Sequence, residues 1–150
     1  MNQSYTDGST ILIVDDTLPT LDLLLTHLSR CGFKVLVAQD GMRAIEQAEC
    51  AEPDLILLDV MMPGFDGFET CRSLKESDVT RDIPVIFMTS LSDIDHILMG
   101  FEVGAVDYIT KPVDYREVEV RVRAHLATRH LHQDLRAELA ERESPFGRIS

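Results

Sequence analysis

Side chains suited to phosphate chemistry follow directly after four of the apolar runs in this 150-residue chain. They are Asp15, Asp16, Asp59, Thr89 and Lys111. Crowded carboxylates repel one another unless a cation offsets their charge, and Mg²⁺ prefers such oxygen ligands. A Mg²⁺ ion held by Asp16, Asp59 and a backbone carbonyl just past Asp59 would meet this need, with the ammonium group of Lys111 opposite.

Such a site suits an incoming phosphoryl group. Phosphoryl transfer depends mainly on positioning and on charge neutralisation. An aspartate can act as the nucleophile and become an aspartyl phosphate. We therefore expect Asp59 to accept the phosphoryl group, Lys111 to neutralise one of its oxygens, and Thr89 to donate a hydrogen bond to another.

Five apolar runs predict the strands that must position these residues, and a helical pattern follows each run. The expected strands are residues 11–14, 33–38, 55–58, 83–88 and 106–110. This alternation predicts an α/β fold, a doubly wound parallel sheet with five helices on its two faces. The flavodoxin-like strand order 2-1-3-4-5 is the natural choice for five such units, and it brings the carboxyl ends of the strands to one crevice.

The last helix is expected to be unusually long. Its apolar stripe continues well past the ~12 residues of an average helix and comprises Val118, Val122, Leu126, Leu131, Leu135 and Leu139. We expect this helix to run from about Asp114 to Glu143, where Ser144 and Pro145 stop it. An exposed helix of this kind is marginal alone, so the stripe packs either on a second copy of the chain, as a coiled coil in a homodimer, or on its own domain.

These elements divide the chain into four parts. We expect a flexible arm over residues 1–10, one folded domain over 11–127, a helical extension over 128–143 and a flexible tail over 144–150. We read the three cysteines, Cys31, Cys50 and Cys71, as reduced helix residues because they show no CxxC spacing. We place His125, His130 and His132 on a solvated helix face.

Charge and hydropathy exclude several partners. The net charge is −12, carried by the first 110 residues, and an acidic body argues against binding to nucleic acid. No apolar run approaches the ~18–20 residues that span a bilayer. The amino terminus lacks the basic start and apolar core of a signal peptide. The expected location is therefore the cytoplasm, without a membrane partner.

Four stretches carry a resemblance to a known family. They are residues 11–16, 59–64, 88–90 and 104–112. In order and spacing, the chain resembles a receiver domain of two-component response regulators over about residues 9–127. Its ending is similar to that of receivers placed ahead of a kinase or other output domain.

The resemblance implies roles for individual residues. It implies that Asp59 takes a phosphoryl group from the phosphohistidine of a sensor histidine kinase or a phosphotransfer protein. The residues implied to arrange Mg²⁺ are Asp15, Asp16, Asp59 and the backbone carbonyl of Met61, and those implied to bind the phosphoryl group are Thr89 and Lys111. The peptide bond between Lys111 and Pro112 is expected to be cis.

The resemblance also implies a switch. Tyr108 rotates inward as Thr89 moves, which changes the face made by the fourth helix, fifth strand and fifth helix and so controls dimerisation or an output domain. The residues implied to flank the attacking water, Met61 and Leu91, are apolar, which predicts slow loss of the phosphoryl group. Such a protein is no enzyme beyond catalysing its own phosphorylation and slow dephosphorylation.

Three alternatives remain beside this interpretation. A pseudo-receiver would dock partners without accepting phosphate. A phosphotransferase of the haloacid-dehalogenase kind also uses an aspartate at a strand end, but it expects a second aspartate two residues later, where this chain has Met61. Asp15 and Asp16 could also serve only to cap the helix that follows.

Overall fold

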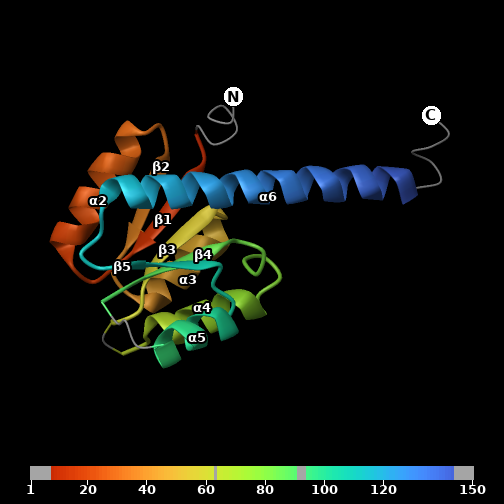
Figure 1. The fold of residues 1–150 in the computed structure, drawn as a ribbon. Coiled ribbons are helices and arrows are strands. Elements are labelled where there is room, and N and C mark those ends of the chain that lie inside the picture. The colour runs from red at the N-terminus through yellow and green to blue at the C-terminus, as the bar shows by residue number, and fades with distance from the viewer. Residues whose placement is uncertain (1–7, 63, 91–93, 144–150) are drawn as a thin grey trace.

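A five-stranded parallel sheet forms the centre of the molecule (Figure 1). The computed structural model describes residues 8–62, 64–90 and 94–143. The strands are β1 (Thr10–Val14), β2 (Lys34–Ala38), β3 (Leu55–Asp59), β4 (Val85–Thr89) and β5 (Asp107–Thr110). Their order in the sheet is β2-β1-β3-β4-β5. The predicted fold and strand order are therefore confirmed, with strand boundaries that differ from the predicted ones by at most two residues.

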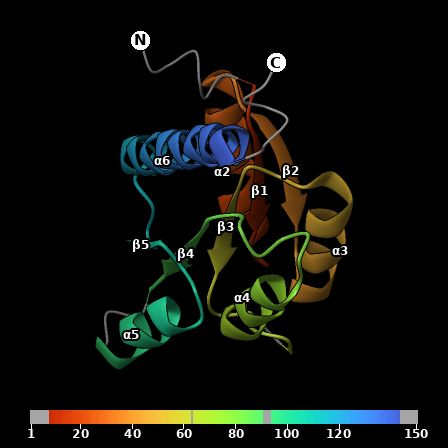
Figure 2. The same cartoon turned by 90° about the vertical axis from the view of Figure 1, so that its right-hand side faces the viewer.

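Five helices of the described chain cover the two faces of the sheet. They are α2 (Leu18–Arg30), α3 (Gly41–Ala51), α4 (Gly67–Glu76), α5 (Ile94–Glu102) and α6 (Tyr115–Glu143). Helices α2 and α6 lie on one face, and α3, α4 and α5 lie on the other (Figures 1 and 2). The predicted start of α5 at Ser92 lies outside the described residues.

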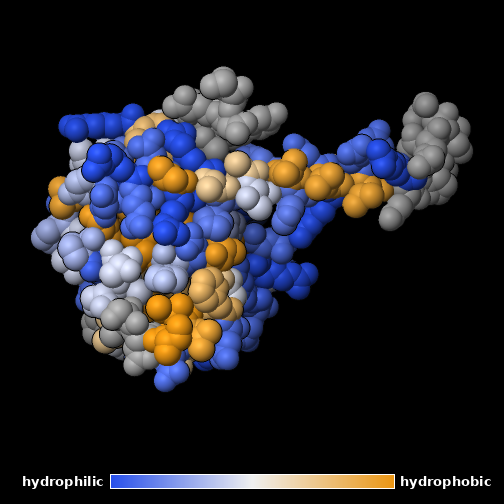
Figure 3. Space-filling model, viewed as in Figure 1, coloured by the Kyte–Doolittle hydropathy of each residue, from blue (hydrophilic) through white to orange (hydrophobic). Residues whose placement is uncertain are grey.

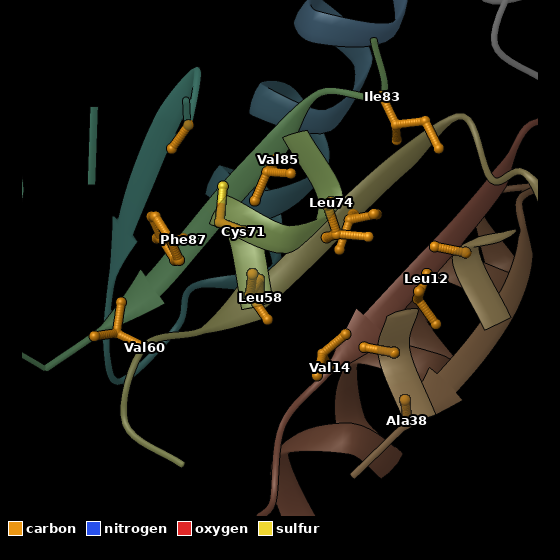
Figure 4. Close-up of a cluster of buried hydrophobic side chains, with 14 of the residues drawn as sticks. Leu12, Val14, Ala38, Leu58, Val60, Cys71, Leu74, Ile83, Val85 and Phe87 are labelled. Atoms are coloured by element: carbon orange, nitrogen blue, oxygen red, sulfur yellow. The ribbon is translucent and has the colours of Figure 1, made fainter. Parts of the chain in front are cut away.

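Alternate side chains of the central strands enter two separate cores. On one face, Leu58 and Val85 pack with Leu74 of α4 (Figure 4). On the other face, Ile13 and Leu57 pack with side chains of α2 and α6. Strands β1 and β3 have apolar side chains on both faces because both faces are buried, which explains the uninterrupted apolar runs in the sequence.

Side-chain caps fix the start of α3 and α4, two of the helices that cover the same face of the sheet. Asp40 accepts a hydrogen bond from the backbone N–H of Arg43 at 2.8 Å and so caps α3. Asp66 and Glu69 form a reciprocal capping box at the start of α4, with distances of 2.9 and 3.1 Å. Such caps satisfy backbone N–H groups that have no partner within the helix.

The amino-terminal boundary differs from the predicted one. Thr10 opens β1, and the carbonyl of Ser9 accepts a hydrogen bond from the N–H of Lys34 at 2.9 Å. Thr10, expected in the arm, therefore belongs to the sheet, and Ser9 is hydrogen-bonded at its edge. The remainder of the arm, residues 1–7, lies outside the described residues, as does the tail over 144–150 with Ser144 and Pro145.

Helix α6 runs to Glu143 as predicted, and its apolar stripe has two environments. The first three stripe residues, Val118, Val122 and Leu126, are fully buried against the sheet. Leu131, Leu135 and Leu139 are 60%, 48% and 52% exposed. Figure 3 shows apolar surface on the part of the helix that projects beyond the body. The stripe thus rests on its own domain for its first half only.

Two smaller expectations need correction. His125 and His130 are partly buried instead of solvated, and Nε2 of His125 is 3.0 Å from a carboxylate oxygen of Asp107, whereas His132 is exposed as expected. Cys31 lies just past the end of α2 rather than inside a helix, whereas Cys50 and Cys71 are helical. All three cysteines are free. Among the described residues, no helix is long and apolar enough to cross a membrane.

Candidate functional site

The predicted site residues gather at the carboxyl ends of the strands. Asp59 is the last residue of β3 and pairs with Met88, the neighbour of Thr89 on β4. The N–H of Lys111 donates to the carbonyl of Thr89 at 2.8 Å, and the N–H of Asp15 donates to the carbonyl of Ala38 at 3.1 Å. Val14 of β1 also pairs with Leu58 of β3, so Asp15 follows its strand beside Asp59.

Three carboxylates and one amine form the centre of the site. Oxygens of Asp15, Asp16 and Asp59 all lie within 4.8 Å of one another. The Nζ atom of Lys111 is 2.8 Å from Oδ2 of Asp15 and 3.3 Å from Oδ1 of Asp59. Asp15 and Asp59 are buried, at 0% and 2% exposure, while Asp16 is exposed. The predicted grouping is present, with Lys111 in direct contact with two of the acids.

Burial and neighbouring charges shift the pKa values of two residues in the site. Burial, followed by the nearby charge of Asp15, raises the pKa of Asp59 from 3.8 to about 6, although Lys111 opposes the shift. Burial alone would lower the pKa of Lys111, but hydrogen bonds and charge from Asp15 and Asp59 outweigh it, and the pKa of Lys111 is raised. The amine of Lys111 therefore stays protonated, and Asp59 is the residue whose ionised form the site disfavours.

The acid cluster fits a divalent cation. Oxygen ligands of Asp15, Asp16 and Asp59 are the type that Mg²⁺ binds, and one ammonium group does not neutralise three carboxylates. Asp16 is exposed, which leaves an approach from solvent. Burial and the charge of Asp15 raise the pKa of Asp59, and a bound cation would oppose both effects.

Local backbone contacts orient the two buried acids. The N–H of Met61 donates to Oδ1 of Asp59 at 3.2 Å, and the N–H of Thr17 donates to Oδ1 of Asp15 at 2.8 Å. Asp15 thus supports the start of α2 with one oxygen and contacts Lys111 with the other. The helix-supporting role and the site role therefore coexist in one side chain.

Gly67 is a supporting residue that the sequence reasoning missed. Its N–H donates to the carbonyl of Val60 at 3.0 Å, so α4 begins directly against the end of β3. A Cβ atom at this position would overlap the carbonyl of Asp59 and lie 2.8 Å from the Cα of Val60. Only glycine allows this approach, but its place after an ordinary helix cap gave no such signal.

The proposed switch residues share a small cavity behind the acid cluster. Thr89, 5% exposed, lines this cavity together with Phe87 and Tyr108. The cavity has a volume of about 10 Å³, roughly the space of one water molecule. Tyr108 is half-buried and contacts the ring of Phe101 edge-on, with centroids 6.2 Å apart.

A second cluster of charges that the sequence reasoning missed joins β5 to α6. Both carboxylate oxygens of Asp107 accept from Arg121, at 3.0 and 2.9 Å, and Oδ2 is 3.0 Å from Nε2 of His125. Burial would raise the pKa of Asp107, but these partners outweigh it and lower that pKa. The pairing ties α6 to the strand that carries Tyr108.

The peptide bond between Lys111 and Pro112 is cis, as the resemblance implied.

Comparison with curated proteins identifies regulators as relatives. The DNA-binding dual master transcriptional regulator RpaA of Synechocystis sp. is 44% identical over 116 residues, which cover 77% of this chain and 48% of RpaA. The response regulator PleD of Caulobacter vibrioides is 45% identical over 114 residues, which cover 76% of this chain and 25% of PleD. The chain thus spans from a quarter to about half of the length of these relatives.

Solved structures and a family profile agree with this relationship. A crystal structure of a response regulator from Chloroflexus aurantiacus has a TM-score of 0.77 and 35% identity, and the match covers 81% of this chain and 99% of that chain. The chemotaxis protein CheY4 of Vibrio cholerae has a TM-score of 0.75 and 26% identity, with coverage of 78% and 98%. The profile of the response regulator receiver domain matches residues 11–123. By fold, site geometry and sequence, the chain belongs to the response regulator receiver domain family.

Proposed function

We propose that this chain is a phosphorylation-controlled switch of a two-component system, acting in the cytoplasm. In this proposal, Asp59 accepts a phosphoryl group from the phosphohistidine of a sensor histidine kinase or a phosphotransfer protein. The observation that carries the proposal is the contact of Lys111 with Asp15 and Asp59 beside a third acid, at the carboxyl ends of the strands.

The side chains of the site divide the chemistry among them. Asp59 attacks phosphorus as a carboxylate, and the bond between phosphorus and the histidine nitrogen of the donor breaks. A pKa of about 6 leaves Asp59 mostly ionised at neutral pH. Lys111, already 3.3 Å from Oδ1 of Asp59, neutralises negative charge on the transferred group. The hydroxyl of Thr89 donates a hydrogen bond to another phosphoryl oxygen.

Receiver domains generally bind Mg²⁺ at this acidic pocket. We propose Asp15, Asp16, Asp59 and the backbone carbonyl of Met61 as its ligands. When bound, the ion supplies the positive charge that lets three acids and a phosphoryl group share the site.

The cavity between Thr89 and Tyr108 supports the proposed switch. Thr89 and Tyr108 both line this cavity, so movement of Thr89 toward the phosphoryl group would open space into which Tyr108 rotates. The same motion alters the face formed by α5, β5 and α6. This face exposes apolar side chains of α5, with Ile94, Leu98 and Phe101 at 64%, 53% and 45% exposure (Figure 3).

We propose that this face and the exposed stripe of the α6 extension support a homodimer or contact an output domain. Exposed apolar patches of this kind mark interaction surfaces. The match covers only 48% of RpaA, so we do not extend the DNA binding in the name of that protein to the present chain. The net charge of −12 of the present chain also disfavours binding to DNA.

Intact-mass measurement after incubation with acetyl phosphate and Mg²⁺ tests the proposal. We expect the mass to increase by one phosphoryl group in the wild type but not in Asp59→Asn or when Mg²⁺ is chelated. A mass that never changes would support a docking module that does not accept phosphate. Steady turnover of small phosphoesters would instead support a phosphotransferase.

The lifetime of the phosphoryl group provides a second test. Leu91 lies outside the described residues, while the side chain of Met61 is 59% exposed. Because apolar neighbours position attacking water poorly, we expect dephosphorylation to be slow and to accelerate in Leu91→Glu. Loss within seconds in the wild type, or no difference between the two proteins, would contradict this expectation.

A further inference from the structure

A second group of ligand-type side chains lies between α2 and α6. It consists of His27, Cys31 and Glu119, whose ligand atoms all lie within 4.8 Å of one another. Helix α2 has 13 residues, about 20 Å at about 1.5 Å per residue, and it runs away from the acid cluster. His27 and Cys31 lie at its far end. The group is therefore separate from the phosphorylation site.

The spacing of these atoms matches the edges of a tetrahedral zinc site. Nε2 of His27 is 3.4 Å from Oε1 of Glu119 and 3.7 Å from Sγ of Cys31. Zinc lies about 2.0 Å from nitrogen and oxygen and about 2.3 Å from sulfur, so tetrahedral angles place N and O about 3.3 Å apart and N and S about 3.5 Å apart. These two distances exceed the tetrahedral values by about 0.1 and 0.2 Å, and the Sγ atom of Cys31 lies within 4.8 Å of the ligand oxygen of Glu119.

Neighbouring side chains hold the ligands in this arrangement. Arg123 donates to Oε2 of Glu119 at 3.1 Å, which leaves Oε1 directed at His27. The ring of Tyr115 stacks on His27 with centroids 5.4 Å apart. Arg123 also donates to the carbonyl of Cys31 at 3.1 Å and lies over the ring of Phe33. Outer contacts of this kind orient metal ligands in proteins.

We propose that His27, Cys31 and Glu119 bind Zn²⁺, with water as the fourth ligand. A thiolate and an imidazole favour zinc over Mg²⁺, so this site and the acid cluster select different ions. On binding, the S–H bond of Cys31 breaks, a sulfur–zinc bond forms, and the proton leaves to solvent. His27 lies in the last turn of α2, Cys31 lies just past the end of that helix, and Glu119 belongs to α6. The ion would therefore link the first part of α6 to the end of α2.

Cobalt substitution tests this site without any phosphorylation step. The full chain is titrated with Co²⁺ in excess Mg²⁺, which occupies the acid cluster. We expect a near-ultraviolet charge-transfer band from thiolate to cobalt, with visible bands of tetrahedral intensity, that saturate at one ion per chain and disappear on adding Zn²⁺. A folded wild type without the charge-transfer band would overturn the proposal.

Variants locate the ion. We expect Cys31→Ser to abolish the charge-transfer band and to weaken Zn²⁺ binding about tenfold or more, while Cys50→Ser, which removes an exposed cysteine on α3, leaves both unchanged. His27→Gln should weaken Zn²⁺ binding to a similar extent. This variant tests the site independently if Cys31→Ser fails to fold. An unchanged band or affinity in either ligand variant would place the metal elsewhere and reject the site.

Thermal unfolding tests whether the bound ion stabilises the contact between α2 and α6. We expect Zn²⁺ to raise the Tm of the wild type and of Cys50→Ser, because the ligands from α2 and α6 are together only in the folded chain. The Tm of Cys31→Ser should not respond. A shift of equal size in Cys31→Ser would mean that stabilisation comes from another site and would contradict the proposal.

Discussion

Replacing Asp59 by asparagine should stabilise the metal-free protein, and the gain should depend on pH. The folded environment raises the pKa of Asp59 from 3.8 to about 6, and the side chain is almost fully buried. One pKa unit corresponds to about 1.4 kcal/mol, so ionising Asp59 costs the fold about 3 kcal/mol. An asparagine of the same shape avoids this cost.

The sign follows from proton binding. Between pH 3.8 and about 6 the folded state holds the proton of Asp59 more tightly than the unfolded state does, so stability falls as pH rises. About half of the cost is present at pH 5 and all of it at pH 8. The difference in free energy of unfolding between Asp59→Asn and the wild type should therefore grow by about 1.5 kcal/mol between these pH values.

Urea unfolding with a metal chelator, at several values between pH 5 and 8, measures this difference. Asp22→Asn is a suitable control because it removes an exposed carboxylate on α2, and its difference from the wild type should stay constant. Added Mg²⁺ at pH 8 should raise the free energy of unfolding of the wild type more than that of Asp59→Asn. If the difference in free energy of unfolding between Asp59→Asn and the wild type is equal at pH 5 and pH 8, or is smaller at pH 8, the electrostatic account of the site is refuted.

Three further substitutions test contacts described above. Gly67→Ala should lower the free energy of unfolding by about 3 kcal/mol in urea titrations, because the added methyl group overlaps the end of β3; an unchanged midpoint would contradict this close approach. Val122→Ala should cost about 2 kcal/mol while Val120→Ala costs almost nothing, since the two side chains are 0% and 67% exposed; equal losses would contradict the described orientation of α6. His125→Ala should lower Tm because the carboxylate of Asp107 loses one of its partners, whereas replacing the exposed His132 by alanine should not; equal Tm values for the two variants would contradict a stabilising role for that contact.

The sequence predicted the sheet and the grouping of the site because both follow from local pattern and topology. Uninterrupted apolar runs at β1 and β3 require burial on both faces, and only a parallel sheet covered by helices provides that. Once the strands are parallel, residues that follow them must share one edge. Asp15, Asp59 and Lys111 come together for this reason, although they are far apart in the chain.

Contacts that depend on how helices lie across the sheet were not predictable in the same way. His125 was expected on a solvated face of the last helix, yet its ring reaches Asp107 of β5. The need for glycine at position 67 arises from the approach of α4 to Val60, which no local pattern encodes. The apolar stripe continues past Leu126 after one five-residue step to Leu131, so it did not show whether its second half packs on the domain or projects from it.

The continuity of α6 gives the molecule a mechanical lever. Arg129 donates to the carbonyl of Asp54 at 2.9 Å, and farther along the helix Arg136 forms an exposed ion pair with Asp82 at 3.5 Å. An exposed pair of this kind contributes little to stability, so it does not prevent a tilt of the helix. From Arg129 to Glu143 the helix extends about 21 Å at about 1.5 Å per residue. A tilt of about 10° at the base therefore moves the far end by about 4 Å at this length. A displacement too small to disturb the core would thus become a movement of side-chain size at the tip.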